Sequence, residues 1–391
     1  MAQVPKVRLS GGLEICRLLN GMWQVSGAHG PIDPHKAVKA MEAYVNAGMT
    51  SFDMADIYGP AEEIFGKFNS QASINSALPA EWHRFLSPCV HRSLKWAWGS
   101  ANAAHGGSDT CEGLIREGVE GRGSSEGQGR DRPSVQGLTK WVPRPGPMDR
   151  KVVEKAIQRS MSRMQVDRLD CLQFHWWDYQ DKRYLEALGH LSDLQQEGMI
   201  GELALTNFDT RRLEEITSRG IQISSNQVQY SIIDRRPAAK MEKFCLAHDV
   251  KLLTYGTLGG GLISERYLGC EEPKSRAELS TASLSKYKNM VDLWGGWGLF
   301  QELLSALDVV AGRHGCSIAN VATKYVLDRP AVGGVIVGCR LGVAGAEHIQ
   351  DNLRSLNVSI TPEDLSAIDH VLHRSRDLMC AIGDCGDEYR H

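Results

Sequence analysis

The sequence lacks several features that would assign it to other classes of protein. It has no uninterrupted apolar run long enough to cross a membrane, and its first residues have neither the apolar stretch of a secretory signal nor the Arg/Ser bias of a transit peptide. The formal net charge is only −3, which gives no electrostatic attraction to nucleic acid or to an anionic membrane. These absences predict a cytoplasmic protein that binds neither nucleic acid nor membrane.

Common motifs of metal and nucleotide binding are also missing. The ten cysteines are scattered, and none forms a Cys-x-x-Cys pair or a zinc-finger spacing with histidine. Cys380 and Cys385 stand near each other, but free thiols are the expectation for a protein of this class. There is no Gly-x-Gly-x-x-Gly after a strand, no Walker-type loop and no His-Glu-x-x-His. We therefore expect no bound metal and no phosphate loop of these types.

What is present is a regular alternation of short apolar runs and amphipathic helices. The 391 residues are 42% hydrophobic and 23% charged, which is sufficient for a sizeable core. One helix shows the pattern well: Asp33 can cap it, Pro34 can begin it, and Gly48 ends it. Further helices are expected at residues 149–165, 184–198, 210–218, 237–248, 299–313 and 318–327.

Eight of the apolar runs are expected to be β-strands. Strands that alternate with helices form parallel βαβ units. Eight such units fit an α/β fold of the (β/α)8 or TIM-barrel type, with its active site at the carboxyl ends of the strands. A doubly wound sheet is the alternative architecture. The expected strands cover residues 18–23, 49–54, 135–140, 169–175, 200–205, 221–230, 250–255 and 332–337.

Two stretches interrupt the alternation. Residues 69–134, rich in Gly, Ser, Arg and Trp, are interpreted as an atypical insertion after the second strand of a single barrel domain, 1–391. Its part 118–129 has almost no apolar residue, so we expect the long insertion to be disordered there and to hang outside the barrel. Residues 256–297 are expected to form a long glycine-dotted loop, and ordered loops of that length are often functional lids.

Polar side chains at the ends of three consecutive expected strands form a chemically complete set. Asp53 ends one strand and precedes Tyr58 by five residues, Lys140 ends the next strand, and His175 ends the one after. A phenol has a pKa of about 10, but an ammonium beside it favours its ionised form and makes it a usable proton donor. Asp53 would hold Lys140, and His175 would orient a carbonyl or share the proton. Each residue taken alone is more often a cap or a packing residue, but their joint placement predicts a reductase.

Five short motifs, in their order along the chain, resemble those of the aldo-keto reductase superfamily. The resemblance covers nearly the whole chain apart from the insertion, and the combination is specific although no single motif is. The flanks of Lys140 and the C-terminal tail look closest to plant, algal and bacterial reductases akin to the potassium-channel beta-subunit-like branch. The motifs are Asp53-Met54-Ala55-Asp56-Ile57-Tyr58-Gly59, Thr139-Lys140, Gln173-Phe174-His175, Thr206-Asn207-Phe208 and Asn226-Gln227-Val228-Gln229-Tyr230.

The resemblance implies a barrel that binds extended NADPH without a Rossmann fold and transfers a hydride to an aldehyde or ketone. It makes Asp53, Tyr58, Lys140 and His175 the catalytic tetrad, with Tyr58 as the proton donor. The residues that it implies for the cofactor are Asn207, Gln227 and Thr206 at the nicotinamide amide, Tyr255 on its ring, Met22, Trp23 and Gln24 beside the pocket, Gly256, Thr257, Leu258 and Gly261 around the pyrophosphate, and Gly338, Arg340, Asp351 and Asn352 at the adenosine end.

The choice between NADPH and NADH depends on one arginine. The family often has an arginine where this chain has His348, so Arg340 becomes the expected partner of the 2′-phosphate. A solvated surface charge is the other interpretation of Arg340.

Three functions are consistent with these residues. An NADPH-dependent reductase of a small-molecule carbonyl is the first, and a catalytically weak NADP-binding regulatory or scaffold subunit is the second. An unrelated barrel lyase or isomerase is the third, and it would not need the asparagine, glutamine and tyrosine of the cofactor set. Trp23, Trp141, Trp176 and Trp177 either line an apolar substrate pocket or belong to the core. The sequence does not indicate an oligomeric state.

Overall fold

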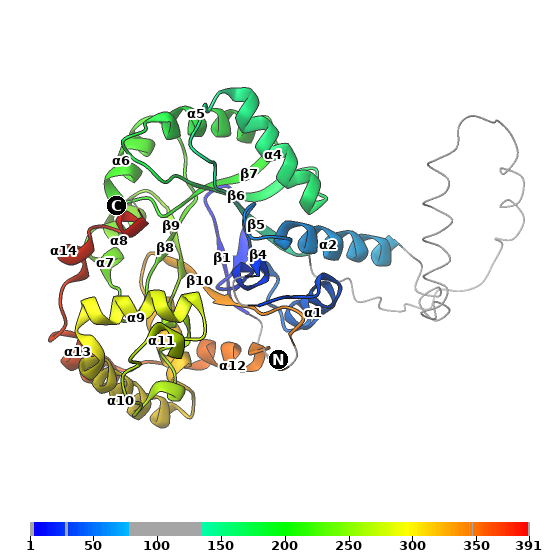
Figure 1. Ribbon diagram of the computed structural model, residues 1–391. Helices are drawn as coiled ribbons and strands as arrows, with labels where there is room; N and C mark the ends of the chain where they lie inside the picture. Colours follow the sequence, from blue (N-terminus) through cyan, green and yellow to red (C-terminus); the bar gives the residue numbers. More distant parts are fainter. Residues whose placement is uncertain (1–3, 28–29, 78–133, 344, 346, 390–391) are drawn as a thin grey trace, which may run out of the picture. The chain divides into compact units, whose positions relative to one another are not determined.

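A computed structural model of the protein describes residues 4–27, 30–77, 134–343, 345 and 347–389. All eight expected strands form, and each pairs in parallel with its neighbours, so that the last closes on the first in a barrel (Figure 1). The predicted (β/α)8 barrel is therefore confirmed. Its strands are β3 (Leu18–Gly21), β4 (Ser51–Asp53), β5 (Gln136–Trp141), β6 (Leu169–His175), β7 (Ile200–Thr206), β8 (Ser225–Gln229), β9 (Lys251–Tyr255) and β10 (Val332–Gly338).

Helices follow the strands and bury their apolar sides against the outside of the barrel. In α1 (Pro34–Asn46) the Asp33 side chain accepts hydrogen bonds from the backbone N–H groups of His35 and Lys36, and Val38 and Met41 are buried. The other helices are α2 (Ala61–Ala77), α4 (Arg150–Met164), α5 (Arg183–Gln196), α6 (Thr210–Ser218), α7 (Arg236–Ala239), α8 (Met241–Ala247), α9 (Ala282–Trp294), α10 (Gly296–His314), α11 (Ile318–Leu327), α12 (Ile349–Arg354), α13 (Pro362–Leu372) and α14 (Leu378–Ile382). None of these helices has the length and apolarity to cross a membrane.

Two expectations about the helices were wrong. The helix expected at residues 237–248 is broken into α7 and α8, because Lys240 has a non-helical backbone (φ −140°, ψ −42°). The stretch 256–297 is not one long loop: it contains three short 3-10 turns and the helix α9. The glycines on either side of α9 led to the prediction of a loop. In the structure the Thr281 side chain caps this helix by accepting a hydrogen bond from the N–H of Leu284.

The expectations for residues 118–129 lie outside the described residues. The same holds for most of the insertion at 69–134, because residues 78–133 are not described. The first residues of that segment do not depart from the barrel pattern, since α2 continues through them to Ala77.

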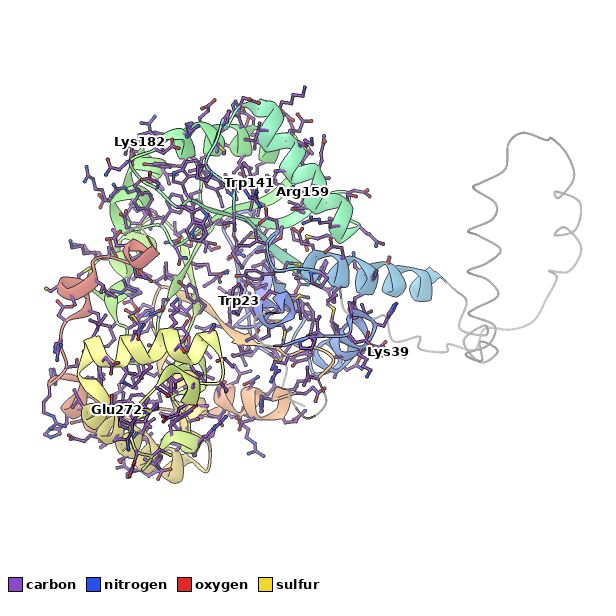
Figure 2. The ribbon with its side chains drawn as sticks, viewed as in Figure 1. Trp23, Lys39, Trp141, Arg159, Lys182 and Glu272 are labelled. Carbon is purple, nitrogen blue, oxygen red and sulfur yellow. The ribbon has the colours of Figure 1, made fainter. Side chains whose placement is uncertain are left out.

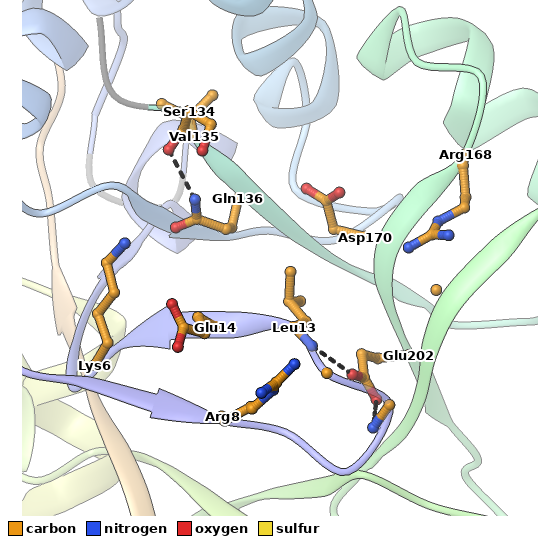
Figure 3. A pocket seen from close by; sticks show the side chains of 13 residues that line it. Lys6, Arg8, Leu13, Glu14, Ser134, Val135, Gln136, Arg168, Asp170 and Glu202 are labelled. Atoms are coloured by element: carbon orange, nitrogen blue, oxygen red, sulfur yellow. Dashed lines mark hydrogen bonds between the residues drawn. The ribbon is translucent and has the colours of Figure 1, made fainter.

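A hairpin that the sequence did not predict closes the amino end of the barrel. Strands β1 (Lys6–Arg8) and β2 (Glu14–Cys16) pair antiparallel, and the backbone N–H groups of Gly11 and Leu13 both donate to the buried Glu202 carboxylate at 3.0 Å. A pocket of about 680 Å³ lies at this end, between the hairpin and the first residues of β5, β6 and β7 (Figure 3). It is thus at the opposite end of the barrel from the strand ends that carry Asp53, Lys140 and His175.

The barrel interior is divided into an apolar layer and a polar layer. Side chains of a strand alternate between the two faces of the sheet. The apolar layer is therefore formed by inward-pointing residues that stand two positions before the polar residues of their strands, namely Leu138, Cys171 and Leu253. These side chains pack with Leu9 and Ile15 of the hairpin. The apolar layer therefore lies between the hairpin and the polar residues near the carboxyl ends of the strands.

A buried ion-pair network holds the C-terminal segment, residues 378–389, against the barrel. The Arg236 guanidinium is almost completely buried, and it donates to Asp234 Oδ2 and to Glu388 Oε2, both at 2.8 Å. The N–H of Thr210, at the start of α6, donates to Asp384 Oδ2 at 3.0 Å. The segment is therefore anchored to the helices that follow β7 and β8. Within it, Cys380 and Cys385 are free thiols.

Candidate active site

A buried lysine–aspartate pair lies at the carboxyl end of the barrel. Strands β4 and β5 are neighbours, with Asp53 opposite Leu138, so Lys140 follows one inward position later. Lys140 Nζ donates to Asp53 Oδ1 at 2.8 Å and to Oδ2 at 2.7 Å. Burial lowers the pKa of Lys140 from its usual value, and the charge of Asp53 opposes that shift. The carboxylate thus holds the ammonium in one orientation.

Tyr58 lies on the turn that follows β4, and this turn is fastened to β5. The Asp56 N–H donates to Lys140 O at 2.9 Å, and the Tyr58 N–H donates to Ala55 O at 3.0 Å. Lys140 Nζ is 5.0 Å from the centre of the Tyr58 ring, and the edge of the Trp23 ring packs against Tyr58 with 5.1 Å between centroids. The half-buried phenol therefore stands beside a fixed cation, which favours release of its proton.

His175 ends β6, the strand next to β5. Its side chain is buried, and its ring lies 4.4 Å from the ring of Trp177, which is 40% exposed. Lys140 thus lies next to two other members of the predicted tetrad, Asp53 and Tyr58. His175 stands at the same end of the adjacent strand, on the side that leads to β7. Their catalytic roles remain predictions.

Gln173 is a further polar residue of this layer that the sequence reasoning did not assign to the site. Its Nε2 donates to Asp53 Oδ1 at 2.8 Å, and its Oε1 accepts a hydrogen bond of 2.7 Å from Gln227 Nε2. Gln227 Nε2 also donates to Asp53 Oδ1 at 2.7 Å. A signal was available: Gln173 stands two residues before His175, so strand alternation puts both on the inner face.

The residues expected around the nicotinamide gather at the ends of three adjacent strands. Asn207 follows β7 with a left-handed backbone (φ 58°), and its Oδ1 accepts a hydrogen bond of 2.8 Å from the Tyr255 hydroxyl. Thr206 Oγ1 is buried and has no hydrogen-bond partner among the described residues. Gln227, the other residue predicted at the nicotinamide amide, donates its amide nitrogen to Asp53 and to Gln173.

The glycine-rich segment after β9 turns tightly beneath α9. Gly256 has a positive φ of 71°, and a Cβ there would come within 2.3 Å of the Tyr287 hydroxyl, so no other residue fits. Thr257 Oγ1 donates to Tyr230 O at 2.9 Å, which ties the turn to the end of β8. Leu258 and the 3-10 turn Gly259–Gly261 continue this segment, and Gly260 and Gly261 are exposed. This is the type of segment that can wrap a pyrophosphate.

The ends of β3 and β10 bring another part of the expected cofactor set together. The Gln24 amide lies directly on Gly338, where a Cβ would come within 1.9 Å of Gln24 Nε2. Gln24 Oε1 is buried and has no hydrogen-bond partner in the described part of the chain. Met22 is fully buried in the core, and its backbone is engaged as well: its N–H donates to Asp53 O at 2.8 Å and its carbonyl accepts from the Val25 N–H at 3.0 Å.

The expected adenosine end is less closely assembled. Arg340 is exposed on the turn that follows β10. Asp351 and Asn352 lie on α12, and the Asp351 carboxylate accepts a hydrogen bond from the Ser317 hydroxyl at 3.4 Å, at the N-terminus of α11. One carboxylate oxygen of Asp351 is therefore already engaged in a hydrogen bond within the protein.

Two buried polar atoms at this end of the barrel, Thr206 Oγ1 and Gln24 Oε1, have no hydrogen-bond partner among the residues that the structure describes, and they lie on opposite sides of the barrel, at β7 and after β3. A buried polar group usually has a hydrogen-bond partner, so these atoms are suited to ligand groups.

Two of the four tryptophans considered for the substrate pocket belong to the core. Trp141 and Trp176 are buried, and both pack on Phe174, with ring centroids 5.4 and 5.9 Å apart. Trp23 and Trp177 are each 40% exposed and pack on Tyr58 and His175 (Figure 2 labels Trp23 and Trp141). An alternating strand turns Trp141 away from the interior because Lys140 points into it.

Asp56 is a second acidic residue near Tyr58. Its carboxylate accepts a hydrogen bond from the Val142 N–H at 3.2 Å and lies 3.7 Å from Arg159. Burial raises the pKa of Asp56 to about 6, and the charge of Glu62 adds to the shift, while the Val142 N–H and two arginines oppose it. The carboxylate is therefore ionised at neutral pH at a cost in stability.

Asp56→Asn is expected to stabilise the protein at neutral pH. The cost of ionising a buried acid is absent below the usual aspartate pKa of about 3.9 and complete above the raised value near 6. The stability gain of the variant should therefore grow as pH rises between these values, to as much as about 3 kcal/mol. Urea unfolding of variant and wild type at several pH values measures it. A gain that is the same at pH 4 and pH 7 would contradict the assignment.

The fold and this arrangement define a (β/α)8 barrel protein with a tyrosine, a lysine and an aspartate together at the carboxyl end of its strands. The model of the Aldo/keto reductase family matches residues 17–77 and 110–373. The chain therefore belongs to the aldo/keto reductase family, and its family supports a general oxidoreductase acting on carbonyl or alcohol groups.

Similar proteins come from bacteria, plants and algae. "Protein tas" of Escherichia coli is 24% identical over 57% of this chain and 67% of its own length. Chloroplastic pyridoxal reductase of Arabidopsis thaliana is 22% identical over 64% of this chain and 66% of its length. Flagellar radial spoke protein 5 of Chlamydomonas reinhardtii is 28% identical over 41% of this chain and 33% of its length. The chain thus spans about one third to two thirds of these relatives.

Solved structures support the fold over almost the full chain. A glycerol dehydrogenase from Gluconobacter oxydans superposes with a TM-score of 0.64 at 20% identity and covers 96% of each chain. A thermostable aldo-keto reductase in complex with the inhibitor epalrestat gives 0.60 at 20% identity, covering 94% of this chain and 99% of its own. At this level of identity the similarity concerns the fold alone.

Proposed function

We propose that the protein is an NADPH-dependent reductase that converts an aldehyde or ketone to an alcohol, with Tyr58 as the proton donor. The observation that carries this proposal is Lys140, which is held by Asp53 and stands 5.0 Å from the Tyr58 ring. A lyase or an isomerase would not need this pair together with the asparagine, glutamine and tyrosine at the ends of β7, β8 and β9.

Each residue of the site has a distinct part in the proposed reaction. Tyr58 gives its proton to the carbonyl oxygen of the substrate, and Lys140 stabilises the phenolate that remains. Asp53 keeps Lys140 charged and directed at Tyr58, and His175 orients the carbonyl by a hydrogen bond. NADPH, when bound, supplies the hydride for the carbonyl carbon. The apolar layer below excludes bulk water from one side of the site, which strengthens these electrostatic effects.

The cofactor would lie along the carboxyl ends of β7, β8, β9 and β10. The nicotinamide would be held by Thr206, Asn207 and Tyr255. The turn from Gly256 to Gly261 would contact the pyrophosphate of the cofactor, and Gln24 would contact the cofactor from the opposite side of the barrel. Gln227 would meet the nicotinamide amide through the acceptor side of its own amide, because its nitrogen is engaged.

Arg340→Ala is expected to raise the KM for NADPH about tenfold or more and to leave the KM for NADH nearly unchanged. Only NADPH carries the 2′-phosphate, and charge-assisted contacts of a guanidinium to phosphate are strong. Initial rates with each cofactor measure the difference. The matched control is Arg354→Ala, because Arg354 is also an exposed arginine but lies on α12, away in the sequence from the turn that carries Arg340. Equal rises for NADPH and NADH would contradict the role of Arg340.

The substrate is proposed to be a ring-bearing or otherwise apolar carbonyl compound. Three large apolar side chains next to the reacting groups are exposed, namely Trp23 (40%), Ile57 (52%) and Trp177 (40%). Burying such surface against a ligand is favourable, and an aromatic ring can also stack on the tryptophans. Relatives called pyridoxal reductase and aryl-alcohol dehydrogenase by name support ring-bearing substrates.

Purified full-length protein incubated with NADPH and a panel of aldehydes tests the proposal directly. The panel pairs ring-bearing aldehydes with short aliphatic ones, and loss of NADPH absorbance reports turnover. Turnover that favours the ring-bearing members is the expected result. Tight NADPH binding without turnover of any member would instead support a regulatory NADP-binding subunit. No NADPH binding would refute both. A cytoplasmic location remains a prediction from the sequence, and cell fractionation tests it.

A further inference from the structure

We propose that Gln173 is a positioning residue that orients both Asp53 and Gln227, and so aligns the proton-donating group with the amide that holds the nicotinamide. This inference rests on the proposed function and adds a residue to its machinery. The structure places Gln173 between the two functional groups, and no other described side chain donates to Asp53 while accepting from Gln227.

The three residues form a closed triangle of hydrogen bonds. Gln173 Nε2 donates to Asp53 Oδ1 (2.8 Å), Gln227 Nε2 donates to the same oxygen (2.7 Å), and Gln227 Nε2 donates to Gln173 Oε1 (2.7 Å). The orientation of the Gln173 amide follows from the chemistry, because a carboxylate oxygen only accepts hydrogen bonds and Gln173 must present its NH2 group to it. The same orientation turns its oxygen toward Gln227.

The position of Gln173 in the barrel makes this triangle possible. Lys140 on β5 is opposite Gln173 on β6, so both inward side chains meet Asp53 from neighbouring strands. Gln173 is completely buried, and an amide without partners would be costly there. With its nitrogen and oxygen both engaged, it is tolerated and rigid. Fully satisfied buried networks of this kind restrict their members to one geometry.

Two consequences for the site follow from the triangle. Asp53 Oδ1 accepts from Lys140, Gln173 and Gln227, so the carboxylate cannot rotate without breaking several hydrogen bonds, and Lys140 stays directed at Tyr58. Gln227 is turned so that its nitrogen faces the interior, which leaves its oxygen as the group for a ligand amide. Loss of Gln173 would loosen both residues at once, although it touches neither substrate nor cofactor.

The first test is a pair of variants in two backgrounds. Q173L is expected to lower kcat by on the order of tenfold in the wild-type background, because a hydrogen bond to a charged group is lost. In a D53N background the same change should lower kcat less than about twofold, since residues that act through one another are not additive. The same factor in both backgrounds, or no change in the wild-type background, would overturn the proposal.

A matched control separates positioning from simple loss of a buried amide. Gln136 is another buried glutamine, on β5 near the amino end, and its side chain makes three hydrogen bonds to Thr50, Ser51 and Ser134. Q136L should lower the melting temperature about as much as Q173L and leave kcat unchanged. NADPH affinity, followed by quenching of tryptophan fluorescence, should weaken several-fold in Q173L and not in Q136L.

A second variant covers the case in which Q173L does not fold. Q173E has nearly the same shape, but it can donate to Asp53 only while its carboxyl group carries a proton. Its kcat should therefore be close to wild type at the acid end of the pH range and fall as pH rises, with no matching fall in the wild type. Parallel pH profiles would overturn the proposal. Wild-type turnover is measured first: its absence refutes the proposed function itself, whereas turnover with unaltered Gln173 variants refutes only this inference.

Discussion

Tyr58→Phe is expected to lower kcat for carbonyl reduction about a thousandfold while leaving NADPH binding nearly unchanged. The change removes the hydroxyl that gives the proton, and general acid catalysis contributes between about a hundredfold and ten-thousandfold. Phenylalanine keeps the ring that packs against Trp23, so the turn after β4 should keep its shape. Steady-state rates with a turned-over aldehyde and a fluorescence titration with NADPH measure the two quantities separately.

The control for this prediction is another half-buried tyrosine, Tyr267, whose ring packs against Trp297 of α10 rather than against Trp23 or Lys140. Tyr267→Phe should leave kcat unchanged. If Tyr58→Phe retains more than about a tenth of wild-type kcat, Tyr58 is not the main proton donor. His175, at the end of the next strand but one from Asp53, would then be the first candidate to replace it.

Lys140→Met is expected to abolish turnover and to destabilise the fold. Without Lys140 the Asp53 carboxylate stays buried with only the two glutamine amides as donors. Breaking a buried ion pair by removing one partner typically costs about 3–5 kcal/mol, because an uncompensated charge remains. Urea unfolding gives the stability, and kcat should fall by on the order of a thousandfold because Tyr58 loses its cation.

A double variant separates the two effects of Lys140. Asp53→Asn together with Lys140→Met removes both charges, so most of the lost stability should return while activity does not. A double variant as unstable as Lys140→Met alone would show that the cost is not electrostatic. Lys288→Met is the matched control: its partners Glu272 and Asp292 are about half exposed, so the loss should be near 1 kcal/mol, and kcat should not change.

Most of the barrel was predictable because its signals are local. Each strand is a short apolar run between turn residues, and the expected bounds of β6 agree with the structure residue for residue. Helix α1 begins at Pro34, directly after the capping Asp33, as those two residues predict. The strand ends could also be identified, and with them the candidates Asp53, Lys140 and His175. Parallel strands then leave few ways to arrange these ends, because crossover connections are right-handed.

The parts that were missed have weaker or contradictory local signals. Helix α9 stands between glycine-rich stretches, and its apolar side becomes evident only when Tyr287 is seen to pack on Gly256. The hairpin of β1 and β2 consists of two strands of three residues each, too short for a clear alternation. Its fold depends on Glu202, which lies almost two hundred positions further along and accepts hydrogen bonds from both Gly11 and Leu13.

Residue types and strand periods, which any single segment carries within itself, are enough to predict a reductase barrel with an aspartate, a tyrosine and a lysine at its mouth. The pairing of the inner polar groups is a different matter, because Gln173 and Gln227 reach Asp53 across 120 and 174 positions. These hydrogen bonds depend on the strand register and on the closure of the barrel, and neither is encoded by a local stretch of sequence. Gln227, which the sequence predicts at the cofactor, therefore also donates a hydrogen bond to Asp53, the aspartate of the proposed tetrad.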